Sequence, residues 1–270
     1  LAPEAATIFS SLKLPVYPTP DRAVNALRLL HESSRAAHHI VSTRQQGVPI
    51  PSSSATEVEL KELWKSVGVP VPLSVVVSDE ESALKAIETV GGRAVFKAVI
   101  PGLLHKSEAG GVALDISSAN GAETYKRLSS LSPDGKSNSV LVETFVPKGV
   151  EALVGVTSSS LGKVLTIGVG GILTEIIGDV ALRLLPVNEE ILREMISETR
   201  LAALFAGARG SAPCDIPAFI AAVLKIAQVA ESWPEGSELD INPITVLPNG
   251  AWVLDSAYSL NSADNEGNHN

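Results

Sequence analysis

The sequence predicts an α/β protein, because short apolar strands alternate with amphipathic helices between residues 56 and 255. The composition agrees: 45% of the 270 residues are hydrophobic and only 4% are aromatic, as expected for aliphatic strands packed against helices. Asn249 and Gly250 lie between two apolar runs and form a hairpin signal, so part of the sheet is expected to be antiparallel.

The ends of the first two helices in this region carry capping signals. Thr56 and Glu59 have the spacing of a capping box, and Asp79 can cap the next helix, which Gly91 and Gly92 end. The pattern predicts helices at 56–68, 79–91, 120–131, 188–206 and 216–231, and strands at 72–78, 93–99, 111–116, 139–146, 151–159, 163–170, 243–247 and 251–255.

The region before residue 56 differs in character. A helix is expected over 21–39 with Asp21 as its cap, and residues 41–55 are rich in Pro, Ser and Gly, as in a linker. Residues 1–40 are too short to bury a core, so they are expected to be the tail of a preceding domain. The chain begins at Leu1 and has one methionine, Met195, so we expect it to be part of a longer translation product.

Charge and cysteine content exclude several classes of protein. A net charge of −9 argues against a general nucleic-acid surface. Cys214 is the one cysteine, which rules out an internal disulfide and suits a reducing, cytoplasmic compartment. The sequence contains neither a signal peptide nor an apolar run of the ~20 residues that cross a membrane. The oligomeric state stays open, a homo-oligomer included.

A loop between two expected strands combines positive charge, a histidine and glycines. Lys97 ends the first strand and can reach a phosphate, although an edge lysine often only extends into solvent. His105 and Lys106 follow and precede the sequence SEAGG, whose glycines allow the backbone to move and to approach a ligand closely. A histidine that carries a phosphoryl group needs access, nearby positive charge and a mobile support, and this loop has all three.

Carboxylates and glycines recur further along the chain. Glu143 lies near the end of a strand and Glu151 at the start of the next, where spacing alone favours ordinary surface carboxylates. The glycines at 170–171 end a strand but lack the Walker pattern. Glu175, Asp179 and Arg183 follow at four-residue steps, so a helix here would have one charged face.

Oxygen donors gather near the predicted hairpin. The segment 238–257 contains Asp240, Asn242 and Asp255, of which the last two lie on the hairpin arms. Mg²⁺ favours a few protein oxygen ligands completed by water and substrate phosphates, which an Asn and an Asp brought together by a hairpin can supply. Polar residues at strand ends are also common without any ligand.

The order of these segments resembles a known family. The segments FKAVIPGLLHKSEAGGV, VETFVPKGVEALVGV, GVGGILTEIIGDVALRLLP and ELDINPI…VLD together resemble the ATP-grasp portion of the ADP-forming (NDP-forming) acyl-CoA synthetases, relatives of succinyl-CoA synthetase. The resemblance covers residues 53–258, and LKLPVYPTPDRAVNALRLL is similar to the end of that family's preceding CoA-ligase domain. It implies an ATP-grasp fold at 56–258, with two subdomains (56–138 and 139–258) whose mixed sheets enclose a nucleotide cleft, and a polar tail at 259–270.

The resemblance also implies an activity and roles for particular residues. The family reversibly converts an acid, CoA and ATP to acyl-CoA, ADP and phosphate through phosphohistidine, with Mg²⁺. By that pattern His105 would be the phosphohistidine on a swinging loop, Asn242 and Asp255 would ligate Mg²⁺, and Lys97 would contact the nucleotide phosphates. The other implied roles are adenine binding by Glu143 and the backbone through Phe145, ribose binding by Glu151, and support of the phosphate region by Lys106, Gly170, Gly171 and Arg183.

The resemblance has departures and leaves alternatives. The segment TSSSLGK at 157–163 has Ser and Leu where the family often has Asp and Phe. The CoA-binding and first phosphohistidine domains would be partners that supply the CoA and acid sites, so this chain is expected to be incomplete for the full reaction. The alternatives are an ATP-grasp ligase without phosphohistidine, and a regulatory module fused to a protein acetyltransferase. Labelling of His105 and binding of Mg-ATP distinguish them.

Overall fold

The computed structural model describes residues 17, 19–24, 26–27, 50–53, 55–100, 109–131, 139–171, 178–207 and 211–260. The chain divides into two compact units, Leu1–Ser42 and Thr43–Asn270. In the first unit, residues 20–24 and 26–27 are helical, which agrees with the start of the helix predicted at 21–39. The rest of that helix lies outside the described residues.

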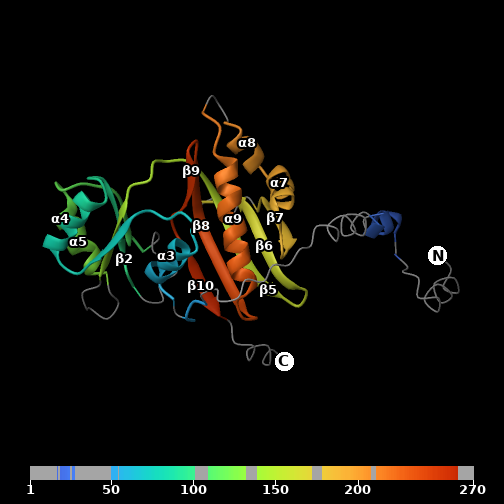
Figure 1. The fold of residues 1–270 in the computed structure, drawn as a ribbon, viewed down its shortest axis with the longest axis horizontal. Helices are drawn as coiled ribbons and strands as arrows, with labels where there is room; N and C mark the ends of the chain where they lie inside the picture. Colours follow the sequence, from blue (N-terminus) through green and yellow to red (C-terminus); the bar gives the residue numbers. More distant parts are fainter. Residues whose placement is uncertain are drawn as a thin grey trace. The chain divides into compact units, whose positions relative to one another are not determined.

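The second unit contains a four-stranded antiparallel sheet. Its strands stand in the order β1-β4-β2-β3, and α4 (Glu80–Thr89) and α5 (Gly121–Ser129) pack on one face (Figure 1). Phe96 and Leu128 are fully buried between the sheet and these helices, so this sheet has an apolar core of its own. The strands are β1 (Ser74–Val77), β2 (Ala94–Ala98), β3 (Val112–Ile116) and β4 (Val140–Thr144).

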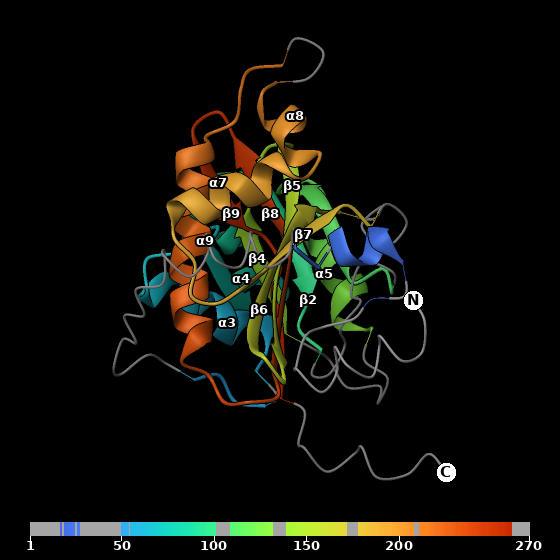
Figure 2. The ribbon, with the colours of Figure 1, turned by 90° about the vertical axis from the view of Figure 1, so that its right-hand side faces the viewer.

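A second, six-stranded sheet follows along the chain. Five strands stand in the order β10-β8-β5-β6-β7, and β9 pairs with β8 through the predicted Asn249–Gly250 hairpin. The helices α7 (Glu189–Ser197), α8 (Leu201–Phe205) and α9 (Ile216–Glu231) lie beside this sheet and share its core (Figures 1 and 2). The strands are β5 (Val150–Ser159), β6 (Gly162–Val169), β7 (Val180–Leu184), β8 (Ser237–Leu247), β9 (Gly250–Val253) and β10 (Ala257–Leu260).

Helix α3 (Glu57–Ser66) contacts both sheets: its apolar side chains pack on the six-stranded sheet and its buried charged side chains pair with the four-stranded sheet. The predicted capping box is present, because Glu59 N–H donates to Thr56 Oγ1 and Thr56 N–H donates to the Glu59 carboxylate. Leu60 and Trp64 on its apolar face are completely buried in the core of the six-stranded sheet. Its other buried residues are Leu63 and two charged residues, Glu57 and Lys61, which take part in the site described below.

Several expected elements differ from the structure. Residues 180–184 form strand β7 instead of the charged helix face considered for this segment, because Ala181 faces the core while Leu182 and Val180 are exposed, a period of two residues. The helix expected at 188–206 is divided into α7 and α8, since the Arg200 N–H donates to the Asp179 carboxylate (2.7 Å) at the break.

The sheets also differ from expectation in direction and extent. Mixed sheets are expected, but every strand pair among the described residues is antiparallel. Strand β4 pairs with β1 and β2, so the change from one sheet to the other comes after residue 144 rather than after 138. Strand β10 was not anticipated and extends the ordered sheet to Leu260.

Candidate functional site

Four charged side chains form a buried cluster that we call the charge quartet: Glu57 and Lys61 of α3, Lys97 of β2 and Glu143 of β4. Lys97 Nζ lies 2.6 Å from Glu57 Oε1 and 3.0 Å from Glu143 Oε2. Lys61 Nζ lies 2.7 Å from Glu57 Oε1 and also donates a short hydrogen bond to Glu143 Oε1. All four residues are at most 7% exposed. Two ammonium groups and two carboxylates therefore neutralise one another away from water.

The two lysines experience different environments. Burial lowers the pKa of Lys97, but the carboxylates of Glu57, Glu143 and Asp255 more than offset this effect and raise the pKa well above its ordinary value. The pKa of Lys61 is lowered, because burial and the nearby Lys97 ammonium outweigh its two carboxylate partners. The more firmly protonated cation is therefore Lys97, the residue predicted from the sequence to meet phosphate.

Lys97 also connects the quartet to the six-stranded sheet. Its ammonium donates to the carbonyl oxygen of Leu254 (2.6 Å), in the turn between β9 and β10. The Leu254 N–H donates to the carbonyl of Pro243, directly after Asn242 (3.0 Å). The half-buried Asp255 follows Leu254, and its Oδ1 accepts the Ser256 N–H (2.9 Å). The predicted lysine and the predicted metal ligands are thus linked through this turn.

A glycine turn at the end of β6 joins two more predicted residues. Gly170 N–H donates to the Glu151 carbonyl (2.9 Å), and Gly171 N–H donates to Asn242 Oδ1 (2.8 Å). Gly171 has a φ of 84°, a left-handed conformation that favours glycine, and a Cβ at this position would displace the flexible Glu151 carboxylate. Glu151 and Asn242 alternate with buried residues of β5 and β8 and therefore lie on the sheet face away from α7–α9.

The residues predicted to hold adenine lie at the end of β4. The Glu143 carboxylate is already bound by Lys61 and Lys97 in the quartet. Phe145 N–H donates to the carbonyl of Arg93 (3.1 Å), and the Arg93 guanidinium lies 4.3 Å from the centre of the Phe145 ring. The side chain of Glu143 and the amide of Phe145 are thus engaged within the protein.

Arg183 is not brought to this group of residues. It alternates with the exposed Leu182 and Leu184 on β7, on the same sheet face as the buried Ala181, and its guanidinium pairs with Glu198 at the end of α7 (Nη1–Oε2 3.1 Å). His105 and Lys106 lie outside the described residues, and their roles remain predictions.

Glu57 and Lys61 are the site residues that sequence reasoning missed. They sit at positions i and i+4 of an otherwise amphipathic helix, where an exposed helix pair is the ordinary interpretation. One sequence signal was available: Lys61 lies next to Leu60 on the apolar side of the helix, so its charge is buried and requires a partner. That this partner is Glu143, 82 positions away, depends on tertiary contacts.

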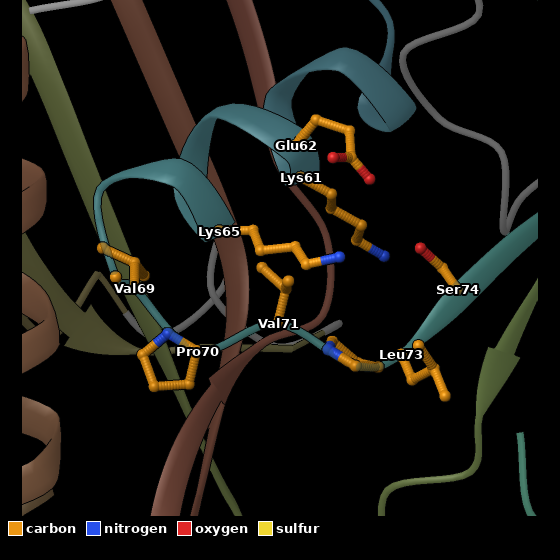
Figure 3. A pocket seen from close by; sticks show the side chains of 10 residues that line it. Lys61, Glu62, Lys65, Val69, Pro70, Val71, Leu73 and Ser74 are labelled. Carbon is orange, nitrogen blue, oxygen red and sulfur yellow. The ribbon is translucent and has the colours of Figure 1, made fainter.

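A pocket of about 350 Å³ lies between α3 and the segment Gly68–Ser74 (Figure 3). Its lining includes Lys61, Lys65 and Ser74, whose polar ends point toward the space between the helix and the start of β1 (Figure 3). The pocket borders the quartet at Lys61, whereas Glu151 and Asn242 are not among its lining residues. We therefore place the functional site at the converging side chains and not at this pocket.

Comparison with known sequences identifies the family. Residues 51–260 match the ATP-grasp domain. The chain is 35% identical over 210 residues to the acetate–CoA ligase [ADP-forming] I subunit beta of Pyrococcus furiosus, an alignment of 76% of this chain and 90% of that protein. It is 31% identical over 202 residues to the 4-hydroxybutyrate–CoA ligase [ADP-forming] of Nitrosopumilus maritimus, covering 72% of this chain and 29% of that protein.

Solved structures agree with the sequence comparison. The chain is similar to a dinucleotide-forming acetyl-coenzyme A synthetase 1 of Ca. Korarchaeum cryptofilum in complex with coenzyme A, Ca-AMPCP and HgCl⁺ (TM-score 0.72, 30% identity, 77% of this chain and 94% of that chain). A second structure of that enzyme holds coenzyme A and Mg-AMPPCP, with a phosphohistidine segment pointing towards the nucleotide-binding site (TM-score 0.67, 30% identity, 77% and 93% coverage).

Proposed function

The chain belongs to the ATP-grasp family of the ADP-forming acid–CoA ligases, and we propose that it binds the nucleotide and transfers the phosphoryl group in the conversion of an acid, CoA and ATP to acyl-CoA, ADP and phosphate. The observation that carries this proposal is the convergence of Lys97, Asn242, Glu151 and Asp255, which come from different strands and turns yet are linked through two short segments.

The nucleotide would be held by the polar faces of both sheets. Lys97 would bind the phosphates, and Glu151, on the open face of β5, would bind the ribose hydroxyls. Because the Glu143 carboxylate and the Phe145 amide are already engaged, adenine binding at the end of β4 would use backbone carbonyl oxygens. Firm protonation of Lys97 suits it to a multiply charged phosphate, since its charge persists at neutral pH.

The oxygen donors fit Mg²⁺ when a nucleotide completes the set. Asp255 offers a carboxylate, and the Asn242 amide oxygen has a second lone pair besides the one that accepts the Gly171 N–H. Among the described residues no group of three or more His, Cys, Asp or Glu side chains could hold a metal. Two protein ligands, water and nucleotide phosphates match how Mg²⁺ is usually bound. When bound, the ion would neutralise phosphate charge.

The phosphoryl carrier of this proposal is His105, which lies between β2 and β3 in the sequence. A neutral imidazole is the required nucleophile, and the ordinary histidine pKa of ~6.5 leaves most of it neutral near pH 7. Its nitrogen would form a bond to the transferred phosphorus while the bond from that phosphorus to ADP breaks. Lys106 would offset the charge of the resulting phosphoryl group.

Nucleotide binding is the first test. Mg-ADP should raise the melting temperature of the chain and give a saturable isotherm in calorimetry, because a ligand selective for the folded state stabilises it. The double variant Asn242→Ala/Asp255→Ala should bind ADP without the enhancement by Mg²⁺, and Glu189→Ala, a surface ion-pair variant, is the control. An absence of saturable binding at millimolar ADP contradicts the proposal.

Phosphoryl transfer is the second test. Incubation with γ-labelled ATP and Mg²⁺ should place acid-labile, base-stable phosphate on the peptide that contains His105. His105→Ala should abolish this label with little change in ATP affinity, whereas His31→Ala should leave it unchanged. Label that survives in the His105→Ala variant would refute the carrier assignment while leaving the nucleotide site intact. The CoA and acid sites would be supplied by partner domains or chains, as in relatives named as ligase subunits.

A further inference from the structure

We propose that Glu57 and Lys61 are positioning residues for Lys97, which together determine how readily its ammonium exchanges a carboxylate partner for a nucleotide phosphate. The inference rests on the proposed function, because it requires a nucleotide phosphate that can replace one of the protein partners of Lys97. The positioning role of these two residues of α3 is inferred from their contacts with Lys97 and Glu143.

The ammonium group of Lys97 already has protein partners for its hydrogen-bond donors. An ammonium group has three N–H donors, and three oxygen atoms lie within hydrogen-bonding distance of Lys97 Nζ: those of Glu57 (2.6 Å), Leu254 (2.6 Å) and Glu143 (3.0 Å). The donors of Lys97 are therefore committed to protein oxygens. Binding of Lys97 to a phosphate requires that at least one of these contacts is given up.

When Lys97 turns toward a phosphate, the carboxylate of Glu57 or Glu143 loses one of its counter-ions. A buried carboxylate without a counter-ion is strongly unfavourable. Lys61 already contacts the same two carboxylates, Glu57 and Glu143, so it keeps a positive charge beside both when Lys97 turns toward a phosphate. The duplicated cation explains why two lysines occupy a site that is at most 7% exposed.

Lys61 and Glu57 should have opposite effects on the affinity of Lys97 for a phosphate. The charged groups that face Lys97 in the described part of the chain include Glu57 and Lys61 from α3, Glu143 from β4 and Asp255 from the β9–β10 turn. Removal of the Lys61 charge leaves an excess of carboxylate that retains Lys97. Removal of the Glu57 charge leaves an excess of ammonium that favours phosphate. A purely structural cluster has no such opposition in ligand affinity.

The experiment measures the affinity of the full chain for Mg-ADP and for adenosine by calorimetry. Lys61→Met should weaken ADP binding about tenfold and Glu57→Gln should tighten it about threefold, changes of the size that ~1.4 and ~0.7 kcal/mol produce. Adenosine, which has no phosphate, should bind each variant as it binds the parent. The double variant Lys61→Met/Glu57→Gln restores charge balance and should bind ADP within about twofold of the parent.

The controls separate the two proposals from each other and from unfolding. Lys85→Met removes an exposed lysine with one helix partner, Glu81, and should change neither affinity. If Lys61→Met does not fold, Glu57→Gln and the balanced double variant still test the sign of the effect. Parallel losses for ADP and adenosine, or unchanged ADP affinity in folded variants, overturn the positioning role. A parent chain that binds no ADP instead overturns the proposed function.

Discussion

The four-stranded and the six-stranded sheet share one design and use it differently. Each has an apolar face covered by helices and a second face that carries polar residues of the site. On the small sheet these are Lys97 and Glu143, which are buried and paired with α3. On the large sheet they are Glu151 and Asn242, which are half-buried and arranged around the Gly170–Gly171 turn.

The site residues of the small sheet therefore depend on electrostatics, and those of the large sheet depend on backbone geometry. The small sheet supplies a cation whose partners are other charges, so its properties change when any member of the quartet changes. The large sheet supplies oxygen atoms whose positions depend on backbone conformation, above all the positive φ of Gly171. We therefore expect substitutions on the small sheet to act through electrostatics and those on the large sheet through shape.

The largest expected effect comes from truncating one phenylalanine in each core. Phe219→Ala in the large core and Phe96→Ala in the small core should each cost about 3–5 kcal/mol of unfolding free energy, since both side chains are completely buried. The three tryptophans are Trp64, Trp233 and Trp252, of α3, the segment after α9, and β9. Trp64 and Trp233 belong to the large core, so the fluorescence reports mainly on the large sheet.

That arrangement of probes makes the comparison testable by urea unfolding. For Phe96→Ala the circular dichroism transition should begin before the fluorescence transition, because the small core is destabilised selectively. For Phe219→Ala the fluorescence midpoint itself should fall. Coincident transitions in the Phe96→Ala variant would mean that the two sheets unfold as one cooperative unit.

An intermediate effect is expected at the glycine turn. Gly171→Ala should destabilise the chain by about 1–2 kcal/mol because of its left-handed conformation, with a small further loss because the flexible Glu151 carboxylate must move away from the added Cβ. Gly178→Ala is the control, since it has a positive φ of 57° but nothing within 4 Å of the added Cβ. Thermal unfolding should show the larger decrease for Gly171→Ala. Equal decreases in melting temperature would contradict the expectation that the space beside Glu151 matters at the Gly170–Gly171 turn.

The smallest effects concern the caps of one helix from each region. Thr56→Ala removes the cap of α3 and should cost about 1 kcal/mol, and the lost side-chain acceptor of the Glu59 N–H is an uncharged hydroxyl. Asp79 caps α4, and the hydrogen bonds from Ser82 lower its pKa below the ordinary 3.8. Its contribution is therefore present above pH 3.8 and lost as the pH falls through the lowered pKa.

Unfolding measured at several pH values distinguishes these two caps. The penalty of Asp79→Ala should shrink in acid by more than that of Thr56→Ala, because the capping group of Thr56 is an uncharged hydroxyl. A penalty for Asp79→Ala that stays constant to pH 2 would show that its carboxylate charge does not stabilise α4.

The sequence predicted much of the fold because most of its signals are local. The capping box at Thr56, the Asp79 cap, the hairpin at Asn249–Gly250 and helix α9 were all confirmed. Strand β7 was not predicted, because the four-residue spacing of Asp179 and Arg183 imitates a helix, whereas the alternation along 180–184 is one of burial and not of residue type. Short segments contain too few residues to separate the two periods.

Composition, element order and the family motifs thus determined the ATP-grasp fold and its class of chemistry. Only the tertiary structure decided which charges meet. It paired Lys97 with Glu57 and Lys61 with Glu143, and it placed Arg183 with Glu198 on the opposite side of the large sheet from Glu151. The physical reason is that caps and turns satisfy neighbouring backbone groups, whereas a buried charge is satisfied by whichever opposite charge the packing brings within about 3 Å.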